Sequence, residues 1–246
     1  MSTAYRKNFQ IRPTEVDRYG RLKPSAMLLY IQQIAGEHSD SYNLTYDALA
    51  ERGIFWAVIR HQLEIHRLPT QGETIRVETW PMPTTRSAFP RAAAGYDEKG
   101  NLVFRCTSLW VLMDIESRQM VLPGRSGIDL EGLVRGDELA APGSLYPIEG
   151  DVAATRRVWY SELDRNGHMN NTRYLDWALD LLEPEFHRQN TLRKATLCYL
   201  SEIREGEDIQ LVRTTSPEGI FRVDAHRART DVPSKTERVF AVQLEI

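Results

Sequence analysis

The chain of 246 residues has little cysteine and no long apolar run, and each shortage excludes a class of protein. Its two cysteines, Cys106 and Cys198, are too few for a disulfide framework, which favours a reducing compartment. The longest apolar stretches, such as Ala26–Ile31, fall far short of the roughly 20 residues that span a membrane. The opening segment MSTAYRKNFQ lacks the apolar core of a signal peptide. We therefore expect a cytoplasmic protein that does not enter a membrane.

The sequence also lacks a long basic block and the short motifs of common cofactor sites. With a formal net charge of −3, general attraction to nucleic acid is not expected. The patterns GxGxxG, GxxxxGK[ST] and GxSxG do not occur, which argues against a dinucleotide site, a phosphate loop and a nucleophile elbow. The histidines, including His61 and His66, show no spacing typical of metal ligands. We predict no metal site and no cofactor.

The chain does contain one internal repeat. EVDRYGRLKPSAMLLY begins at Glu15, and ELDRNGHMNNTRYLDW begins 147 residues later at Glu162. A second pair of similar segments, around Gly72 and Gly206, follows in the same order at an offset of 134 residues. Two matches in the same order rarely arise by chance, so we predict a duplication of one structural unit.

The repeat divides the chain into three parts. We predict a first unit over 1–125 and a second over 151–246, with a linker over 126–150 that is rich in glycine, proline and acidic residues. In each unit a strand leads into the repeated turn, then into a helix, then into segments where apolar and charged residues alternate. One helix followed by antiparallel strands, twice, predicts an α+β fold.

Local signals place these elements more closely. Pro24 suits the first position of a helix, and DEKGN at Asp97–Asn101 is typical of a hairpin turn. In the second unit, Asn170 or Asn171 can cap a helix that Pro184 ends or kinks.

The two copies differ in the chemistry of the turn. Where the first copy has Tyr19 and Arg21, the second has Asn166 and His168, an amide and an imidazole beside a helix start. Histidine is the side chain most easily poised near neutral pH, and a helix start suits a developing oxyanion. The alternative is an ordinary solvated turn whose polar side chains bond to the backbone, as Asp164 can.

A glutamate in the second copy favours the functional interpretation. Glu202 takes the place of Leu68 of the first copy, in the same copy that gained His168. An edge-strand glutamate that points to water is the alternative. Together, Asn166, His168 and Glu202 form a carbonyl polariser, an imidazole and a base, which fits acyl transfer to water.

Other reactive residues are weaker candidates. Cys198 lies in the strand-like run ATLCYL and is predicted to pack rather than to react. Several arginines surround the predicted site in sequence and form either an ordinary solvated face or a local basic dock; they include Arg156, Arg157, Arg165 and Arg173.

Ser161–Trp177, which reads SELDRNGHMNNTRYLDW, resembles the hallmark of acyl-acyl-carrier-protein thioesterases, the plant plastid enzymes and their bacterial relatives. Their motif reads approximately SDLDxNxHVNNxxYxxW. The resemblance continues through ATLCYLSEIREGE, where the family carries a catalytic glutamate, and through Arg105–Met120. It implies a tandem hotdog fold, in which each unit is a long central helix wrapped by an antiparallel sheet.

The resemblance also implies roles for single residues of the second unit. The family's catalytic residues fall on Asp164, Asn166, His168 and Glu202, and Gly167, Asn170 and Asn171 are expected at the substrate. The residue after the glutamate, often cysteine in plant members, is Ile203 here, which disfavours a cysteine nucleophile.

The implied substrate is a fatty acyl thioester of an acyl-carrier protein, docked on Arg156, Arg157, Arg165 and Arg173, without a cofactor. Since no transit peptide is evident in the sequence, we expect a bacterial, cytoplasmic form. An acyl-CoA thioesterase, a dehydratase of acyl thioesters and a non-catalytic acyl-thioester-binding protein are the alternatives, and formation of a homodimer is left open.

Overall fold

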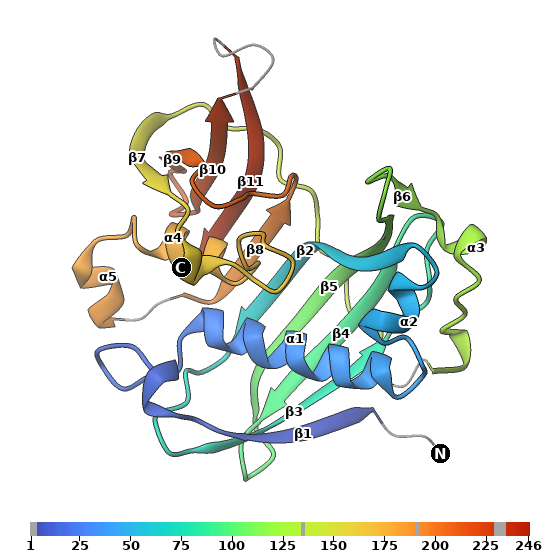
Figure 1. Ribbon diagram of the computed structural model, residues 1–246. Helices are drawn as coiled ribbons and strands as arrows, with labels where there is room; N and C mark the ends of the chain where they lie inside the picture. Colours follow the sequence, from blue (N-terminus) through green and yellow to red (C-terminus); the bar gives the residue numbers. More distant parts are fainter. Residues whose placement is uncertain (1–3, 134–135, 190–191, 229–234) are drawn as a thin grey trace. The chain divides into compact units, whose positions relative to one another are not determined.

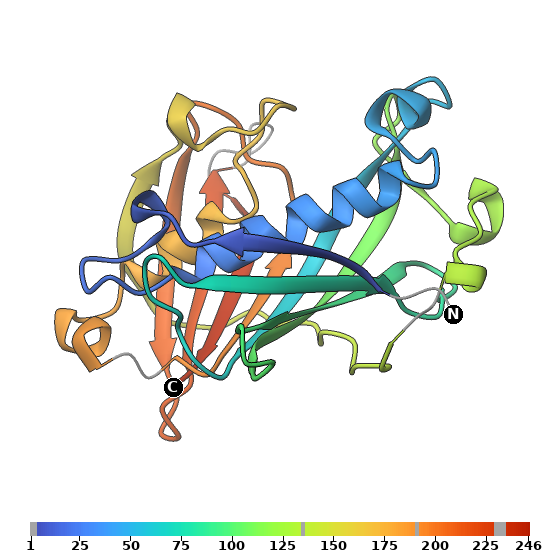
Figure 2. The same ribbon diagram turned by 90° about the horizontal axis from the view of Figure 1, so that it is seen from below.

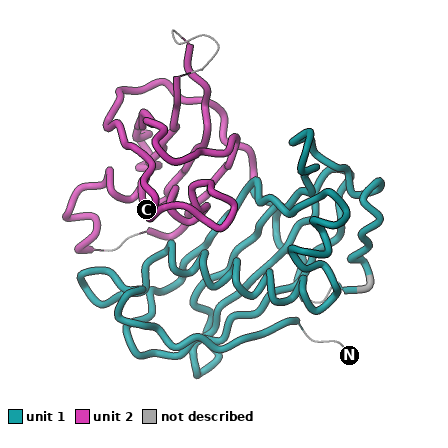
Figure 3. The backbone as a smooth tube through the Cα atoms, viewed as in Figure 1, with its two compact units in different colours: residues 1–142 teal, residues 143–246 magenta. Residues whose placement is uncertain are grey.

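The computed structural model describes residues 4–133, 136–189, 192–228 and 235–246. Backbone contacts divide the chain into two compact units, unit 1 over residues 1–142 and unit 2 over residues 143–246 (Figure 3). None of the helices within the described ranges has the length and apolar character of a membrane span.

The division differs from the predicted one, because most of the stretch predicted as a linker belongs to unit 1. Leu130 is buried in a cluster with Phe89 and Leu112. The indole Nε1 of Trp80 donates a hydrogen bond to the carbonyl oxygen of Asp137 at 3.0 Å. Glycine, proline and acidic residues suggested a surface linker, but a few apolar side chains suffice to anchor such a segment to a core.

Unit 1 contains an antiparallel sheet with strand order β1-β3-β4-β5-β2, and β6 pairs with the C-terminal end of β5. Its strands are β1 (Tyr5–Gln10), β2 (Ile54–Ile65), β3 (Thr74–Pro81), β4 (Phe89–Tyr96), β5 (Leu102–Asp114) and β6 (Met120–Val121). Its helices are α1 (Pro24–Asp40), α2 (Tyr46–Ala50) and α3 (Pro123–Ser126), with 3-10 turns at Pro13–Glu15 and Glu131–Leu133. The predicted hairpin turn at 97–101 joins β4 to β5.

The central helix of unit 1 forms as the sequence predicts. Pro24 is its first residue, where a missing N–H costs nothing. Met27, Ile31 and Ile34 lie one turn apart and are fully buried. This apolar face packs on β1 and β3, so that the sheet wraps around α1 (Figures 1 and 2).

Unit 2 repeats the architecture with the strand order β8-β11-β10-β9-β7. Its strands are β7 (Asp151–Arg157), β8 (Lys194–Tyr199), β9 (Asp208–Thr215), β10 (Phe221–Ala228) and β11 (Thr236–Glu245). Its helices are α4 (Arg173–Leu179) and α5 (Pro184–Gln189), with a 3-10 turn at Tyr160–Glu162. α4 packs on β11.

The helix of unit 2 is shorter than predicted. α4 has seven residues and α1 has seventeen. The apolar pattern continues to Leu182, but Pro184 cannot accept an interior helical position and instead begins α5. Thr172 directly precedes α4 and makes no capping bond with its side chain, whereas the side chain of Asn170 accepts the N–H of Thr172, as predicted for a cap.

The repeated turn has the same geometry in both units. Gly20 and Gly167 both have φ = +76°, a left-handed conformation that glycine adopts without strain. Asp17 and Asp164 each accept hydrogen bonds on Oδ1 from the backbone N–H groups two and four residues further on, at 2.8 to 3.3 Å. The side-chain bonds of each aspartate therefore shape the turn, and the structure reproduces the duplication read from the sequence.

Candidate active site

Two loops of unit 2 meet at the candidate site. The N–H of Met169 donates to the carbonyl oxygen of Ile203 at 2.8 Å, and His168 forms an antiparallel bridge with Arg204. Within the first loop, the N–H of Asp164 donates to the carbonyl oxygen of His168 at 2.7 Å. These backbone bonds fix the imidazole-bearing loop beside the loop that follows β8.

The structure brings together two of the predicted catalytic side chains. His168 Nε2 lies 3.2 Å from Glu202 Oε2. The His168 side chain is 18% exposed and that of Glu202 is 39% exposed, so the pair is accessible to water. A carboxylate and an imidazole at this distance can share a proton and remove one from a bound water.

Asp164 and Asn166 lie in the same turn and have different surroundings. Asp164 accepts the N–H of Asn166 at 2.8 Å and that of His168 at 3.3 Å, so its carboxylate orients the turn. Asn166 is exposed on the turn, one residue before Gly167 and two before His168. Its contact with a substrate carbonyl therefore stays a prediction.

The two asparagines expected at the substrate hold the start of α4. Oδ1 of Asn170 accepts the backbone N–H of Thr172 at 3.0 Å and its hydroxyl at 2.8 Å. The carbonyl oxygen of Asn171 accepts the hydroxyl of Tyr199 at 3.1 Å. These bonds give both residues a structural task, and their contact with substrate stays a prediction.

The predicted docking arginines carry less free charge than the sequence suggests. Three of them form ion pairs with carboxylates of unit 2: Arg156 with Asp180 at 2.6 Å, Arg157 with Asp208 at 3.1 Å, and Arg173 with Asp176 at 3.3 Å. Arg165 is exposed on the catalytic turn itself. A role of these four arginines in docking stays a prediction.

Two residues close to His168 and Glu202 were not among the predicted site residues. Burial, followed by the charges of Asp164 and Glu202, raises the pKa of Tyr174, which therefore stays a neutral phenol under the site. Arg227 donates from Nη1 to the carbonyl oxygen of Glu202 at 2.8 Å. The helical spacing of Tyr174 was visible in the sequence, but no local signal connects Arg227 with residues 25 positions earlier.

The structure offers no support for a cysteine nucleophile or a metal. Cys198 is buried, and its Sγ lies 3.8 Å from the carbonyl oxygen of Gly143. In the described ranges, no three side chains of the metal-binding types cluster as a metal site requires. The site thus consists of a carboxylate, an imidazole and an exposed amide on a rigid turn.

Comparison with known proteins assigns this arrangement to a family. The model of the acyl-ACP thioesterase N-terminal domain matches residues 2–122, and that of the acyl-ACP thioesterase C-terminal domain matches residues 147–241. The chain belongs to the acyl-ACP thioesterase family. As a member of this family it carries the candidate site in the part that matches the C-terminal domain.

Relatives of this family member include plant enzymes. The acyl-[acyl-carrier-protein] hydrolase of Cuphea viscosissima is 24% identical over 230 residues, which cover 87% of this chain and 56% of that protein. The dodecanoyl-[acyl-carrier-protein] hydrolase of Cinnamomum camphora is 26% identical over 228 residues, which cover 86% of this chain and 59% of that protein. The chain therefore spans little more than half the length of these relatives.

Solved structures share the fold over nearly the whole chain. An acyl-ACP thioesterase from Bacteroides thetaiotaomicron superposes with a TM-score of 0.86 at 23% identity, covering 97% of this chain and 96% of that one. The 12:0-ACP thioesterase from Umbellularia californica superposes with a TM-score of 0.80 at 23% identity, covering 100% and 97%. These similarities confirm the predicted tandem hotdog fold of the acyl-ACP thioesterase family.

Proposed function

We propose that this protein hydrolyses fatty acyl thioesters of an acyl-carrier protein, releasing the free fatty acid and the carrier thiol. The observation that carries the proposal is the 3.2 Å approach of His168 Nε2 to Glu202 Oε2 in unit 2. Relatives named acyl-[acyl-carrier-protein] hydrolases support the choice of reaction and of carrier.

In the proposed mechanism, water attacks the thioester carbonyl carbon. Glu202, with His168, takes the proton from that water, a contribution of roughly 10²–10⁴ in rate for a well-placed base. The amide of Asn166 donates to the carbonyl oxygen as negative charge develops there. The C–S bond then breaks, and the leaving sulfur takes up the proton held by the pair. A thiol has a pKa near ~8.5, so its departure needs little help.

The carrier protein is the proposed acyl donor because the turn presents a cation. Arg165 is exposed beside Asn166, where an acidic carrier would bring the thioester. Arg156, Arg157 and Arg173, which form ion pairs within unit 2, are the other proposed docking residues. A homodimer and a cytoplasmic location stay predictions from the sequence.

The proposal is tested by the rate and products of hydrolysis across acyl-carrier-protein and acyl-CoA thioesters of several chain lengths. We expect free fatty acid from the carrier-protein series and a fall in kcat of at least about 10²-fold for Glu202→Ala. Cys198→Ala is the control and should keep the wild-type kcat. Near-full turnover by Glu202→Ala, an enoyl product, or a preference for acyl-CoA would each overturn this assignment.

A further inference from the structure

Arg227 of β10 fastens the loop that carries Glu202. Its Nη1 donates to the carbonyl oxygen of Glu202 at 2.8 Å, and its Nη2 donates to Oγ of Ser201 at 3.1 Å. A planar guanidinium holds two acceptors in one fixed geometry, and hydrogen bonds from a charged donor are the stronger kind. The residue that bears the proposed base is thus tied to the sheet through its own backbone.

Two carboxylates hold Arg227 in this position. Its Nη1 lies 3.0 Å from Oε1 of Glu207, and its Nε donates to Oε2 of Glu237 at 3.0 Å. Burial lowers the pKa of Arg227, but Glu237 and Glu207 outweigh it and raise the pKa above the ordinary value. The side chain is 21% exposed, so these contacts are partly shielded from water.

Glu207 extends the network to the other loop of the site. Its carboxylate accepts the backbone N–H of Arg204 at 2.9 Å, and Arg204 is the residue that bridges to His168. Arg227 therefore contacts both the backbone of Glu202 and the side chain that fixes the backbone opposite His168. Arg227 is thus connected to the loop of Glu202 and, through Glu207, to the residue that bridges to His168.

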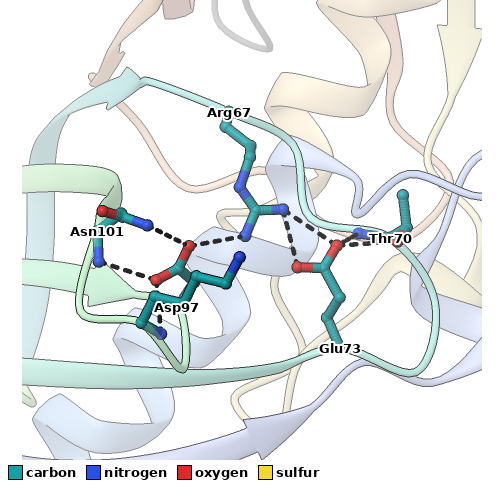
Figure 4. A network of polar contacts seen from close by, with 6 residues as sticks. Arg67, Thr70, Glu73, Asp97 and Asn101 are labelled. Atoms are coloured by element: carbon teal, nitrogen blue, oxygen red, sulfur yellow. Dashed lines mark hydrogen bonds and ion pairs between the residues drawn. The ribbon is translucent and has the colours of Figure 1, made fainter.

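Unit 1 has a comparable network, in which the arginine comes from a different element (Figure 4). There the arginine lies on the loop: Arg67 is 2.8 Å from Glu73 and 3.5 Å from Asp97. In the repeat, Ser201 takes the place of Arg67. Asp97 and Arg227 occupy equivalent positions. Asp97 follows Tyr96, the last residue of β4 that pairs with β3, and Arg227 follows His226, the last residue of β10 that pairs with β9. In unit 2 the cation thus comes from the sheet and reaches the loop.

We propose that Arg227 is a positioning residue for Glu202, an inference that rests on the hydrolysis proposed above. It does not touch the reacting atoms. It fixes the backbone of Glu202 so that the carboxylate stays within reach of His168 and of the attacking water. A misplacement of about 1 Å can cost roughly 10²-fold in rate, so the loss of this anchor is expected to lower kcat rather than raise KM.

The test compares Arg227→Lys and Arg227→Met with Arg67→Met, which removes the arginine that pairs with Glu73 in the network of unit 1. Lysine keeps a positive charge between Glu207 and Glu237 but cannot reproduce the fork to Glu202 and Ser201. We expect kcat to fall about 10-fold in Arg227→Lys and about 10²-fold in Arg227→Met, with KM within threefold of wild type. Arg67→Met should keep kcat within twofold.

Combination with Glu202→Gln separates positioning from general stability. If Arg227 acts through Glu202, adding Arg227→Lys to Glu202→Gln should change the residual rate less than twofold, because coupled residues are not additive. A wild-type kcat in Arg227→Lys, or a full 10-fold loss on top of Glu202→Gln, would refute the positioning role. If Arg227→Met does not fold, Arg227→Lys decides.

The two proposals fail in different ways. If the wild-type chain hydrolyses no acyl thioester, the hydrolase function fails and the role of Arg227 falls with it. If Glu202→Gln keeps the full rate, the role of Glu202 as the base fails, and the role of Arg227 falls with that. If both behave as expected and only Arg227→Lys is unaffected, the hydrolase function stands and the positioning role is refuted.

Discussion

The turn that follows the first strand is built alike in units 1 and 2, but its side chains have different tasks. In unit 1, Arg21 donates to Oδ2 of Asp17 at 2.8 and 3.0 Å and lies 4.7 Å over the ring of Tyr19. In unit 2, His168 stands at the position of Arg21 and approaches Glu202 instead. One turn is closed by an internal ion pair, and the other holds an imidazole beside a carboxylate.

This difference separates framework from chemistry. The bonds that shape the turn, from backbone N–H groups to Asp17 or Asp164, are present in both units. The residues that differ are side chains at equivalent positions, such as Arg21 and His168 in the turn, and Leu68 and Glu202. A duplicated framework can therefore lose or gain a reactive pair without a change in its backbone.

The largest expected contrast comes from equivalent substitutions at His168 and Arg21. His168→Gln removes the imidazole from the pair and should lower kcat at least about 10²-fold. Arg21→Gln breaks an ion pair in the turn of unit 1 and should leave kcat within twofold. Steady-state hydrolysis of an acyl-carrier-protein thioester measures both, and circular dichroism checks that each variant is folded. Equal losses of activity would contradict the assignment of the chemistry to unit 2.

A smaller contrast is expected from Asp17→Asn and Asp164→Asn. Each change keeps an acceptor oxygen but removes the charge, and a hydrogen bond to a charged group is worth about 1 kcal/mol more than a neutral one. Asp17→Asn should cost the larger share of stability, about 1–2 kcal/mol, because it also removes the ion pair with Arg21. Asp164→Asn should lower kcat about tenfold, since it loosens the turn under His168.

Acid titration provides the control for this pair. Burial tends to raise the pKa of Asp17, but hydrogen bonds from Arg21 and Tyr19 outweigh it and hold the pKa below the ordinary value. Since the folded pKa is depressed, the stability that this carboxylate contributes is complete above its unfolded pKa of about 3.9 and disappears as pH falls through the folded pKa. Urea unfolding at several pH values should show a constant difference between wild type and Asp17→Asn from about pH 5 to 7. A difference that does not shrink as the pH falls below about 3.9 would refute this origin.

Much of this arrangement could be predicted from the sequence because it is local or repeated. The offset of 147 residues identified the two turns, and the position of Glu202 relative to Leu68 predicted that its carboxylate lies near His168. The hairpin at 97–101 could be predicted because the residues DEKGN are typical of tight turns. Such features depend on neighbours in the sequence or on a second copy of it.

The remainder depended on packing between distant segments. The apolar spacing of the second helix continues to Leu182, but α4 ends at Leu179, ahead of Pro184. The spacing of apolar residues alone does not show where a helix ends. Leu130 anchors a stretch whose average composition is that of a linker. Arg227 reaches Glu202 from β10, and the two meet because β10 pairs with β11, which pairs with β8.

The smallest effects should come from two equivalent glutamates, one in each unit, that make the same kind of contact. Oε2 of Glu15 accepts the hydroxyl of Tyr30 at 2.6 Å, and Oε1 of Glu162 accepts Nε1 of Trp177 at 2.7 Å. Both glutamates thus fasten the central helix of their unit to the loop before it. Glu15→Gln and Glu162→Gln keep an acceptor oxygen, so each should lower the free energy of unfolding by only about 0.5–1 kcal/mol.

The comparison between Glu15→Gln and Glu162→Gln also tests whether the framework of unit 2 contributes to activity. Since the side chains of Glu15 and Glu162 bind the helix residues Tyr30 and Trp177, both variants should keep kcat within about threefold in the same hydrolysis assay. A large loss of activity for Glu162→Gln alone would show that the framework of unit 2 is itself tuned to the chemistry. Matching small losses would place the whole functional difference between the units in the few side chains exchanged around the turn: His168 for Arg21, Glu202 for Leu68, and an arginine moved from the loop to the sheet.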